Sequence, residues 1–118
     1  MIVRKAEAKD LSIIVEFQLA MAKETEFIEL HRPTVEKGVE AVLCDDSKGI
    51  YYVAEEEGKV VSSLLTTFEW SDWRNGTILW IQSVYVRPEF RRKGVYRKMY
   101  AHIKDLVLNS DKLNGIRL

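Results

Sequence analysis

The stretch from Trp80 to Tyr100 constrains the fold more than any other part of the sequence. It begins inside an apolar segment, Ile78 to Val86, that is typical of a strand. Arg87-Pro88 ends this strand, because proline lacks a backbone donor and disfavours helix in the residue before it. A cationic turn around Gly94 follows, and apolar residues then recur at helical spacing: Val95, Met99, Ile103, Leu106 and Val107. The stretch therefore predicts a strand, a glycine turn and a helix that packs on a sheet.

The turn itself has the features of an anion-binding site. The first amides of a helix lack intrahelical partners, and the helix dipole places positive charge behind them, which suits phosphate. Six cations and one anion lie between Arg87 and Lys98, a local charge of +5 in a chain whose net charge is zero. A charge run alone would indicate a solvated surface turn. A charge run around a glycine at a strand-to-helix junction favours a phosphate site.

The residues of the turn, Arg91-x-x-Gly94-x-Tyr96, resemble the Arg/Gln-x-x-Gly-x-Gly/Ala acyl-CoA signature of the GNAT superfamily of N-acetyltransferases. The preceding segment, Ile81 to Pro88, is similar to the strand of that family that ends in apolar-x-Val-x-Pro. Tyr96 departs from the pattern, since Gly or Ala is usual there. The resemblance implies that the pyrophosphate of acetyl-CoA binds the amides of the turn and that its pantetheine arm pairs with the strand backbone. The implied cofactor-binding residues are Val84, Tyr85, Val86, Arg91, Arg92, Lys93, Gly94, Val95 and Tyr96.

The rest of the chain predicts helices and strands that together form one layered domain. The predicted elements are strand 2–6, helix 8–26, a second helix that begins with Thr34 as its N-cap, and strands 50–54, 59–68 and 77–86. Turns at Glu57-Gly58 and Asn75-Gly76 join the last three strands into an antiparallel meander. Residues 78–81 are apolar on both faces, which predicts a central strand covered by helices on both sides. The expected fold class is therefore α/β in the layered α+β sense, and the resemblance implies a mixed sheet of GNAT type.

The last residues, Asn114 to Leu118, predict the opening of a further strand, parallel to 77–86 and reached through the crossover helix. The resemblance implies one more helix and two more strands, including the segment that protonates the leaving thiolate in that family. We therefore expect residues 1–118 to form a single GNAT-like domain truncated at its C-terminal end. An exposed strand edge invites pairing with another chain, so we expect either association through this edge or reduced stability.

Acetyl transfer to an amine requires a donor that polarises the thioester carbonyl and a base that frees the amine. The resemblance implies that the donor is the backbone N–H of Val84 or Val86. The candidates for the base are Glu69 at a strand end, then Gln82 as a residue that positions a water, then Glu24 or Glu26. Since no activated nucleophile is visible, direct attack without a covalent enzyme intermediate is expected.

Two local clusters each allow a structural and a functional interpretation. Carboxylates at the end of the first helix, at positions 24, 26 and 29, oppose the helix dipole, and they are either a solvated helix end or an acidic site for a cationic amine. Trp70 and Trp73 lie beside Glu69 and Asp72. They either pack on the sheet edge or form a wall at the substrate end of the cleft.

Composition excludes several other classes of protein. The single cysteine, Cys44, allows no internal disulfide, and His31 and His102 lack ligand spacing, so no metal is indicated. No apolar run is long enough for a membrane span and the N-terminus lacks a signal sequence, which predicts a cytoplasmic protein. The basic turn lacks interleaved aromatic residues, which disfavours a nucleic-acid-binding module. The expected function is transfer of an acetyl group to a small-molecule or peptide amine, which is the expected partner. The alternative function is that of a degenerate CoA-binding domain without catalysis.

Overall fold

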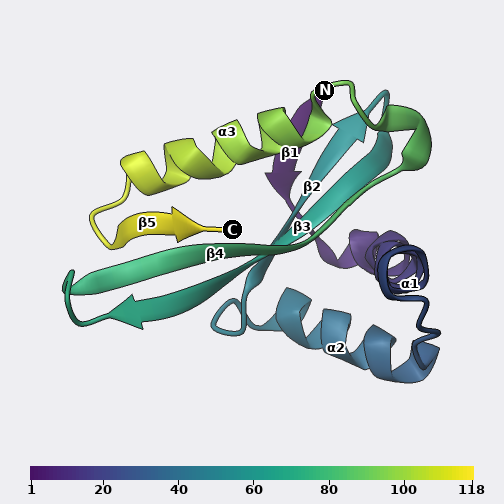
Figure 1. Ribbon diagram of the computed structural model, residues 1–118, viewed down its shortest axis with the longest axis horizontal. Coiled ribbons are helices and arrows are strands. Elements are labelled where there is room, and N and C mark those ends of the chain that lie inside the picture. Colours follow the sequence, from purple (N-terminus) through teal and green to yellow (C-terminus); the bar gives the residue numbers. More distant parts are fainter.

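A computed structural model describes all residues, 1–118, and shows a five-stranded sheet with three α-helices (Figure 1). In chain order the elements are β1 (Ile2–Lys5), a 3-10 helix (Ala8–Asp10), α1 (Leu11–Glu26), α2 (Arg32–Cys44), β2 (Ile50–Glu56), β3 (Lys59–Ser71), β4 (Gly76–Val86), a second 3-10 helix (Pro88–Phe90), α3 (Val95–Leu108) and β5 (Leu113–Arg117). The strand order β1-β2-β3-β4-β5 follows the chain. All pairs are antiparallel except β4–β5, which is parallel. The predicted meander, crossover helix and parallel last strand are thus confirmed.

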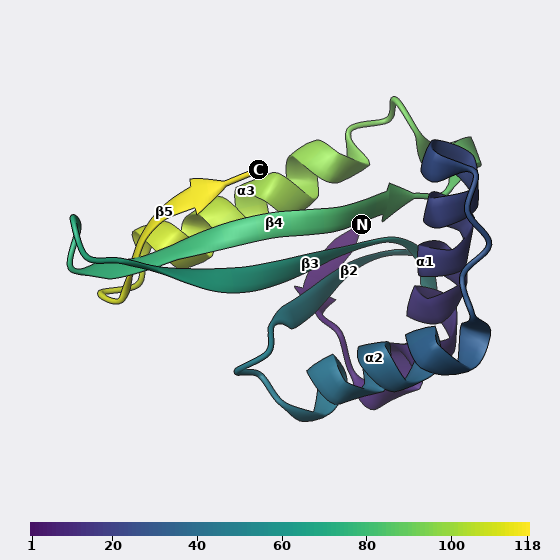
Figure 2. The ribbon, with the colours of Figure 1, turned by 60° about the horizontal axis from the view of Figure 1, so that its bottom comes forward.

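The helices cover the sheet from both sides (Figures 1 and 2). Three buried residues of α3, spaced one turn apart, pack on the first face: Val95, Met99 and Ile103, against Ala54, Val61, Leu64, Leu79 and Ile81. Helices α1 and α2 pack on the second face through Ile14, Val15 and Val39, against Ala6, Tyr51 and Val53. Leu106 lies outside the buried stripe of α3 and is 37% exposed, so its predicted packing on the sheet is wrong. No helix has the length and apolar character needed to cross a membrane.

The hairpin between β3 and β4 extends further than the sequence indicates. Strand β3 continues to Ser71, which pairs with Gly76, so Glu69 and Trp70 belong to the strand and not to a connection. Trp70 is 64% exposed and Trp73 is 93% exposed. The interpretation that both tryptophans pack on the sheet edge is therefore wrong.

Two further predictions need correction. Helix α2 begins at Arg32 with His31 as its N-cap residue, and Thr34 lies in the first turn, because Pro33 is tolerated there without a backbone donor. Helices cover both faces of the sheet as a whole but not both faces of residues 78–81. Leu79 and Ile81 lie under α3, whereas Trp80 on the other face lies beneath the guanidinium of Arg117 in β5.

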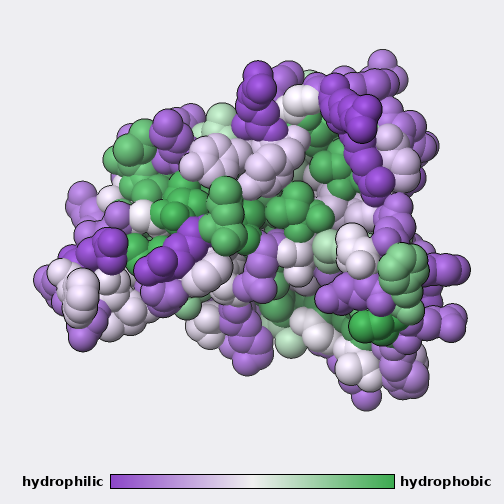
Figure 3. All heavy atoms as spheres, in the orientation of Figure 1, coloured by the Kyte–Doolittle hydropathy of each residue, from purple (hydrophilic) through white to green (hydrophobic).

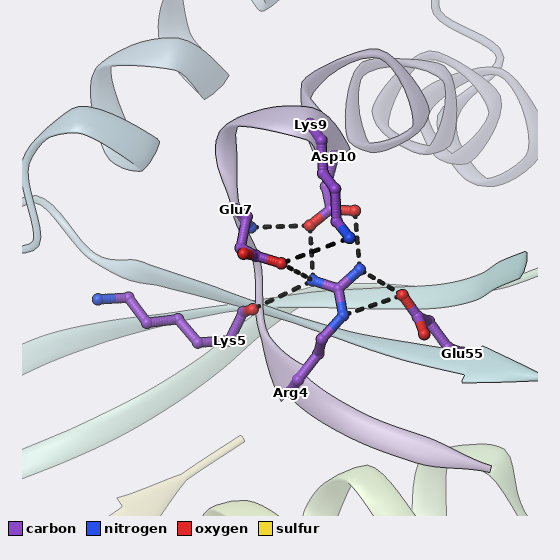
Figure 4. A network of polar contacts seen from close by, with 6 residues as sticks. All are labelled: Arg4, Lys5, Glu7, Lys9, Asp10 and Glu55. Atoms are coloured by element: carbon purple, nitrogen blue, oxygen red, sulfur yellow. Dashed lines mark hydrogen bonds and ion pairs between the residues drawn. The ribbon is translucent and has the colours of Figure 1, made fainter. Parts of the chain in front are cut away.

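A polar network fixes the start of α1 to the edge of the sheet (Figure 4). Arg4 of β1 donates hydrogen bonds to Asp10 at 2.7 and 3.0 Å and to Glu55 of β2. The backbone N–H of Glu7 donates to the same Asp10 carboxylate at 2.7 Å. Asp10 is only 3% exposed, so its charge is balanced inside the protein by Arg4. The network thereby orients α1, which forms one wall of the candidate site.

Candidate cofactor and acceptor site

Strand β4 carries a bulge where it passes beneath α1. Gln82 pairs with Leu65 and Tyr85 pairs with Ser63, so two residues of β4, Ser83 and Val84, lie opposite a single residue of β3. Ser83 has a φ of 53°, in the left-handed region. Such a bulge bends the strand and interrupts its pairing. The sequence gives no sign of it, since no glycine or proline marks the position.

The outer edge of β4 has no neighbouring strand beyond Trp80. Strand β5 pairs with residues 77–80 only, and its last pair joins Trp80 to Arg117. Residues 81–86 therefore have no strand partner on that side, within residues 1–118. An extended ligand with amide groups can pair with such an edge.

A groove runs between α1 and this part of β4. Its first section has a volume of about 460 Å³ and is lined by Met21, Glu24, Thr25, Val84, Tyr85, Val86 and Arg91. Its second section, about 350 Å³, shares Met21 and Thr25 and continues past Ser83 to Glu26 and Leu30. The first section adjoins the cationic turn and the second adjoins the bulge. The two sections together extend from Arg91, the first residue of the predicted phosphate-binding turn, to Ser83 in the middle of β4.

The turn between β4 and α3 has the backbone shape that the sequence predicts. Arg92 and Gly94 both have positive φ, 63° and 80°, and Gly94 is the N-cap residue of α3. A Cβ placed on Gly94 would meet no atom within 4 Å, so the space in front of the helix start is open. Arg92, Lys93 and Gly94 are exposed while Val95 is buried. The turn can therefore present amides and cationic side chains to a phosphate while the helix remains anchored in the core.

Tyr96, which replaces the usual small residue of the signature, causes no break in α3. Its side chain packs against the core beneath α3, and its ring centroid lies 6.3 Å from that of Tyr100. Burial, with a smaller effect from Tyr100, raises the pKa of Tyr96, so the phenol is neutral at physiological pH.

Arg91 points back from the turn over the first section of the groove. Its Nε donates to the carbonyl oxygen of Val86 at 2.9 Å, and its guanidinium lies 5.3 Å from the ring centroid of Tyr85. Its Nη2 also lies 3.3 Å from both carboxylate oxygens of Glu24 on α1. Burial and the Glu24 carboxylate raise the pKa of Tyr85. Glu24, one candidate for the base, thus lies at the cofactor end of the groove.

The other candidates for the base lie at different points on the acceptor side. Gln82 is exposed beside the bulge, and its Nε2 donates to the hydroxyl of Thr67 at 2.7 Å. Glu69 accepts a hydrogen bond from Trp80 Nε1 at 2.6 Å and lies 3.5 Å from Arg117 Nε. Glu69 pairs with Ile78, four residues from Gln82, which is roughly 13 Å along the strand. The two residues therefore belong to different positions along the hairpin. Glu26 lines the second section of the groove.

Sequence reasoning missed several contacts that shape the site. The Arg91–Glu24 pair joins residues 67 positions apart. Phe17 of α1 packs on Tyr85 with ring centroids 5.0 Å apart, and Thr67 orients the amide of Gln82. No spacing in the sequence indicates these pairs, because the first two depend on how α1 lies across the sheet and the third depends on the pairing of β3 with β4.

Comparison with solved structures gives one relative of high similarity. A "possible acetyltransferase" from Clostridium difficile 630 is 45% identical, with a TM-score of 0.93 over 99% of this chain and 77% of that chain. Two more distant structures share the fold. A "predicted acetyltransferase with acetyl-CoA" from Clostridium acetobutylicum is 20% identical, covers 98% of this chain and 80% of that chain, and has a TM-score of 0.73. An aminoglycoside acetyltransferase from an uncultured soil metagenomic sample, in complex with sisomicin, is 16% identical, covers 98% and 74%, and has a TM-score of 0.70.

Comparison with family profiles agrees with the structural comparison, which found acetyltransferases. No curated protein matches the chain. The profile described as "Acetyltransferase (GNAT) family" matches residues 16–118, which include most of α1, the bulged strand, the cationic turn and α3. The chain belongs to the GNAT acetyltransferase family.

Proposed function

We propose that this protein transfers the acetyl group of acetyl-CoA to a primary amine of a small molecule or peptide. The observation that carries the proposal is the groove between α1 and β4, whose two sections extend from Arg91 to the bulge at Ser83. A cofactor with phosphates at one end and a thioester at the other matches the order of these features. Amine acceptors fit the acidic side chains at the end of α1.

The cofactor-binding part of the proposal assigns a role to each part of the turn and strand. The pyrophosphate would bind the amides at the start of α3, with the side chains of Arg91, Arg92 and Lys93 around it. The pantetheine arm would pair with the backbone of residues 84–86 on the side that has no strand partner, as an added strand does. Val95 and Tyr96 complete the helix start. Support comes from the Clostridium acetobutylicum protein of the same fold, whose description includes acetyl-CoA.

The reaction proposed at the bulge is direct attack on the thioester. The amine nitrogen forms the new C–N bond, the C–S bond breaks, and the thiolate takes up a proton as the amine loses one. Acetyl-CoA supplies the activated acetyl group. The backbone N–H of Val84, or that of Val86, would stabilise the negative charge that develops on the carbonyl oxygen.

Among the candidates for the base, the geometry favours Gln82 over Glu69. Because Gln82 donates its amide N–H to Thr67, its carbonyl oxygen is left to accept a hydrogen bond from the amine or from a water beside it. The Glu69 carboxylate is held by Trp80 and Arg117. We therefore propose that Gln82 positions the amine at the bulge, and that Glu69 fixes the far wall of the acceptor side.

The cofactor site is tested by Gly94→Val with Gly58→Val as its matched control. Both glycines have similar positive φ, 80° and 77°, and a Cβ at either would meet open space, so each variant loses about 1–2 kcal/mol of stability through backbone strain. Gly58 lies in the β2–β3 turn, away from the groove. We expect G94V to abolish CoA binding in isothermal titration calorimetry, with a circular dichroism spectrum like that of the parent, and G58V to bind as the parent does.

Three outcomes are informative. CoA binding by G94V with the parental affinity would show that the site lies elsewhere. CoA binding by the parent without thiol release in the presence of a panel of primary amines would favour the alternative, a CoA-binding domain without catalysis. Release of CoA thiol that depends on an added amine supports the proposed transfer.

A further inference from the structure

The guanidinium of Arg91 has two possible anionic partners, a phosphate of the cofactor and the carboxylate of Glu24. It is the first residue of the proposed phosphate-binding turn, and in this structure it also forms an ion pair with Glu24 at 3.3 Å. Both side chains are about half exposed, at 44% and 40%, so a ligand can approach the pair from solvent. Glu24 lines the same section of the groove as residues 84–86. The carboxylate therefore lies where the arm and phosphates of the cofactor would pass.

Two of the contacts of Arg91 do not depend on Glu24. The Nε atom remains bonded to the Val86 carbonyl, and the guanidinium remains stacked over Tyr85. With Glu24 neutral, the arginine would keep this orientation and have its terminal nitrogens free. A cation fixed in this way loses little conformational entropy when it binds a phosphate.

We propose that Glu24 sets the affinity of the groove for CoA by competing with the phosphates of the cofactor for Arg91. The inference rests on the proposed function, because it assumes that CoA binds at the Arg91 turn. In the free protein the Glu24 carboxylate neutralises Arg91. When a phosphate takes its place, Glu24 loses its partner and faces a second anion. CoA binding therefore requires the Arg91–Glu24 ion pair to break. The affinity of the protein for CoA is consequently lower than it would be without Glu24.

The matched pair of variants is Glu24→Gln and Glu26→Gln. Both remove one negative charge from the end of α1, and both side chains line the groove, but only Glu24 contacts Arg91. The free energy of an exposed ion pair is small, and its loss changes a binding constant by about two- to fivefold. We expect E24Q to lower the Kd for CoA by that factor in isothermal titration calorimetry at ~0.05 M NaCl, and E26Q to leave it nearly unchanged. At ~1 M NaCl the advantage of E24Q should fall toward one, since screening weakens both contacts.

A double-mutant cycle separates competition from a merely structural role of Glu24. Arg91→Gln should weaken CoA binding more in the E24Q background than in the parent, because Arg91 is then free to contact phosphate. Equal effects of R91Q in both backgrounds would overturn the proposal.

The other outcomes are equally decisive. Weaker or unchanged CoA binding by E24Q, while the parent binds, would show that Glu24 positions Arg91 or is neutral, and would overturn the competition. An equal gain in E24Q and E26Q would assign the effect to net charge and overturn it too. Absence of CoA binding by the parent and by both variants would overturn the proposed cofactor site itself, and the competition with it.

Discussion

Asp10 is a carboxylate that the fold can bury only because Arg4 reaches it. Its side chain is 4% exposed, and it accepts hydrogen bonds from Arg4 and from the backbone of Glu7 (Figure 4). Asp10→Ala leaves Arg4 with Glu55 and the exposed Glu7 as its acidic partners and removes its bidentate contact, so we expect the free energy of unfolding to fall by about 2–3 kcal/mol in urea titrations. Glu7→Ala is the control, because Glu7 is 61% exposed and a surface ion pair contributes at most about 1 kcal/mol. A loss of stability in D10A no greater than in E7A would contradict this account.

The same contacts give Asp10 a predictable effect on acid stability. Burial alone would raise the pKa of Asp10, but the hydrogen bonds from Arg4 and Glu7 outweigh it and hold the pKa below the ordinary value. The stabilisation is therefore complete above about pH 4 and is lost as the pH falls through the folded-state pKa. The Asp10→Asn variant has no titrating carboxyl group at this position. We expect its unfolding free energy to decline less steeply than that of the parent below about pH 4, and parallel curves would contradict the lowered pKa.

Pairs between residues of different elements cannot be identified from the pattern around a single residue. Asp10 could be placed in the first turn of a helix, and Glu24 at the end of one, from local pattern alone. Their partners, Arg4 and Arg91, depend on where β1 and the cationic turn lie in space. Local spacing carries no information on such packing.

At the scale of elements, the sequence was most informative where a local rule is strong. Alternating apolar residues and turn dipeptides predicted β2, β3 and β4, and the helical spacing after Gly94 predicted α3. The bulge at Ser83 was not predicted, because it arises from the unequal pairing of β3 and β4. The start of α2 was misplaced, because Thr34 is a good N-cap residue in isolation but the helix extends N-terminally through Pro33.

The bulge gives β4 different roles along its length, and this leads to a prediction for Gln82. We expect Gln82→Leu to lower kcat for amine acetylation at least about tenfold, since a group that positions the amine acts on the reacting nitrogen, with little change in KM for acetyl-CoA. Glu69→Gln keeps an acceptor for Trp80 Nε1, and we expect it to change kcat less than about threefold. Steady-state kinetics with both variants measures this. A larger loss of kcat in E69Q than in Q82L would contradict this prediction and would favour Glu69 as the base.

At the scale of the whole molecule, residues 1–118 include an apolar surface that no helix or strand among them covers. Figure 3 shows hydrophobic residues gathered where α3, β4 and the end of β5 lie in Figure 1. Leu118 is 73% exposed there, and residues 81–86 of β4 have no strand on that side. Sheet edges beside apolar surface favour pairing with another chain.

We therefore predict that the 118-residue chain associates at high concentration through this edge. Leu118→Lys places a charge beside the open edge and should shift the association to higher concentration, because edge lysines oppose strand pairing. Leu108→Lys is the control, since Leu108 is 71% exposed but lies at the end of α3, outside the sheet. Sedimentation velocity over a range of concentrations measures the shift. A monomer at every concentration, or an equal effect of both lysines, would show that the edge needs no partner. CoA should compete with the association, because its pantetheine arm would pair with the same residues of β4.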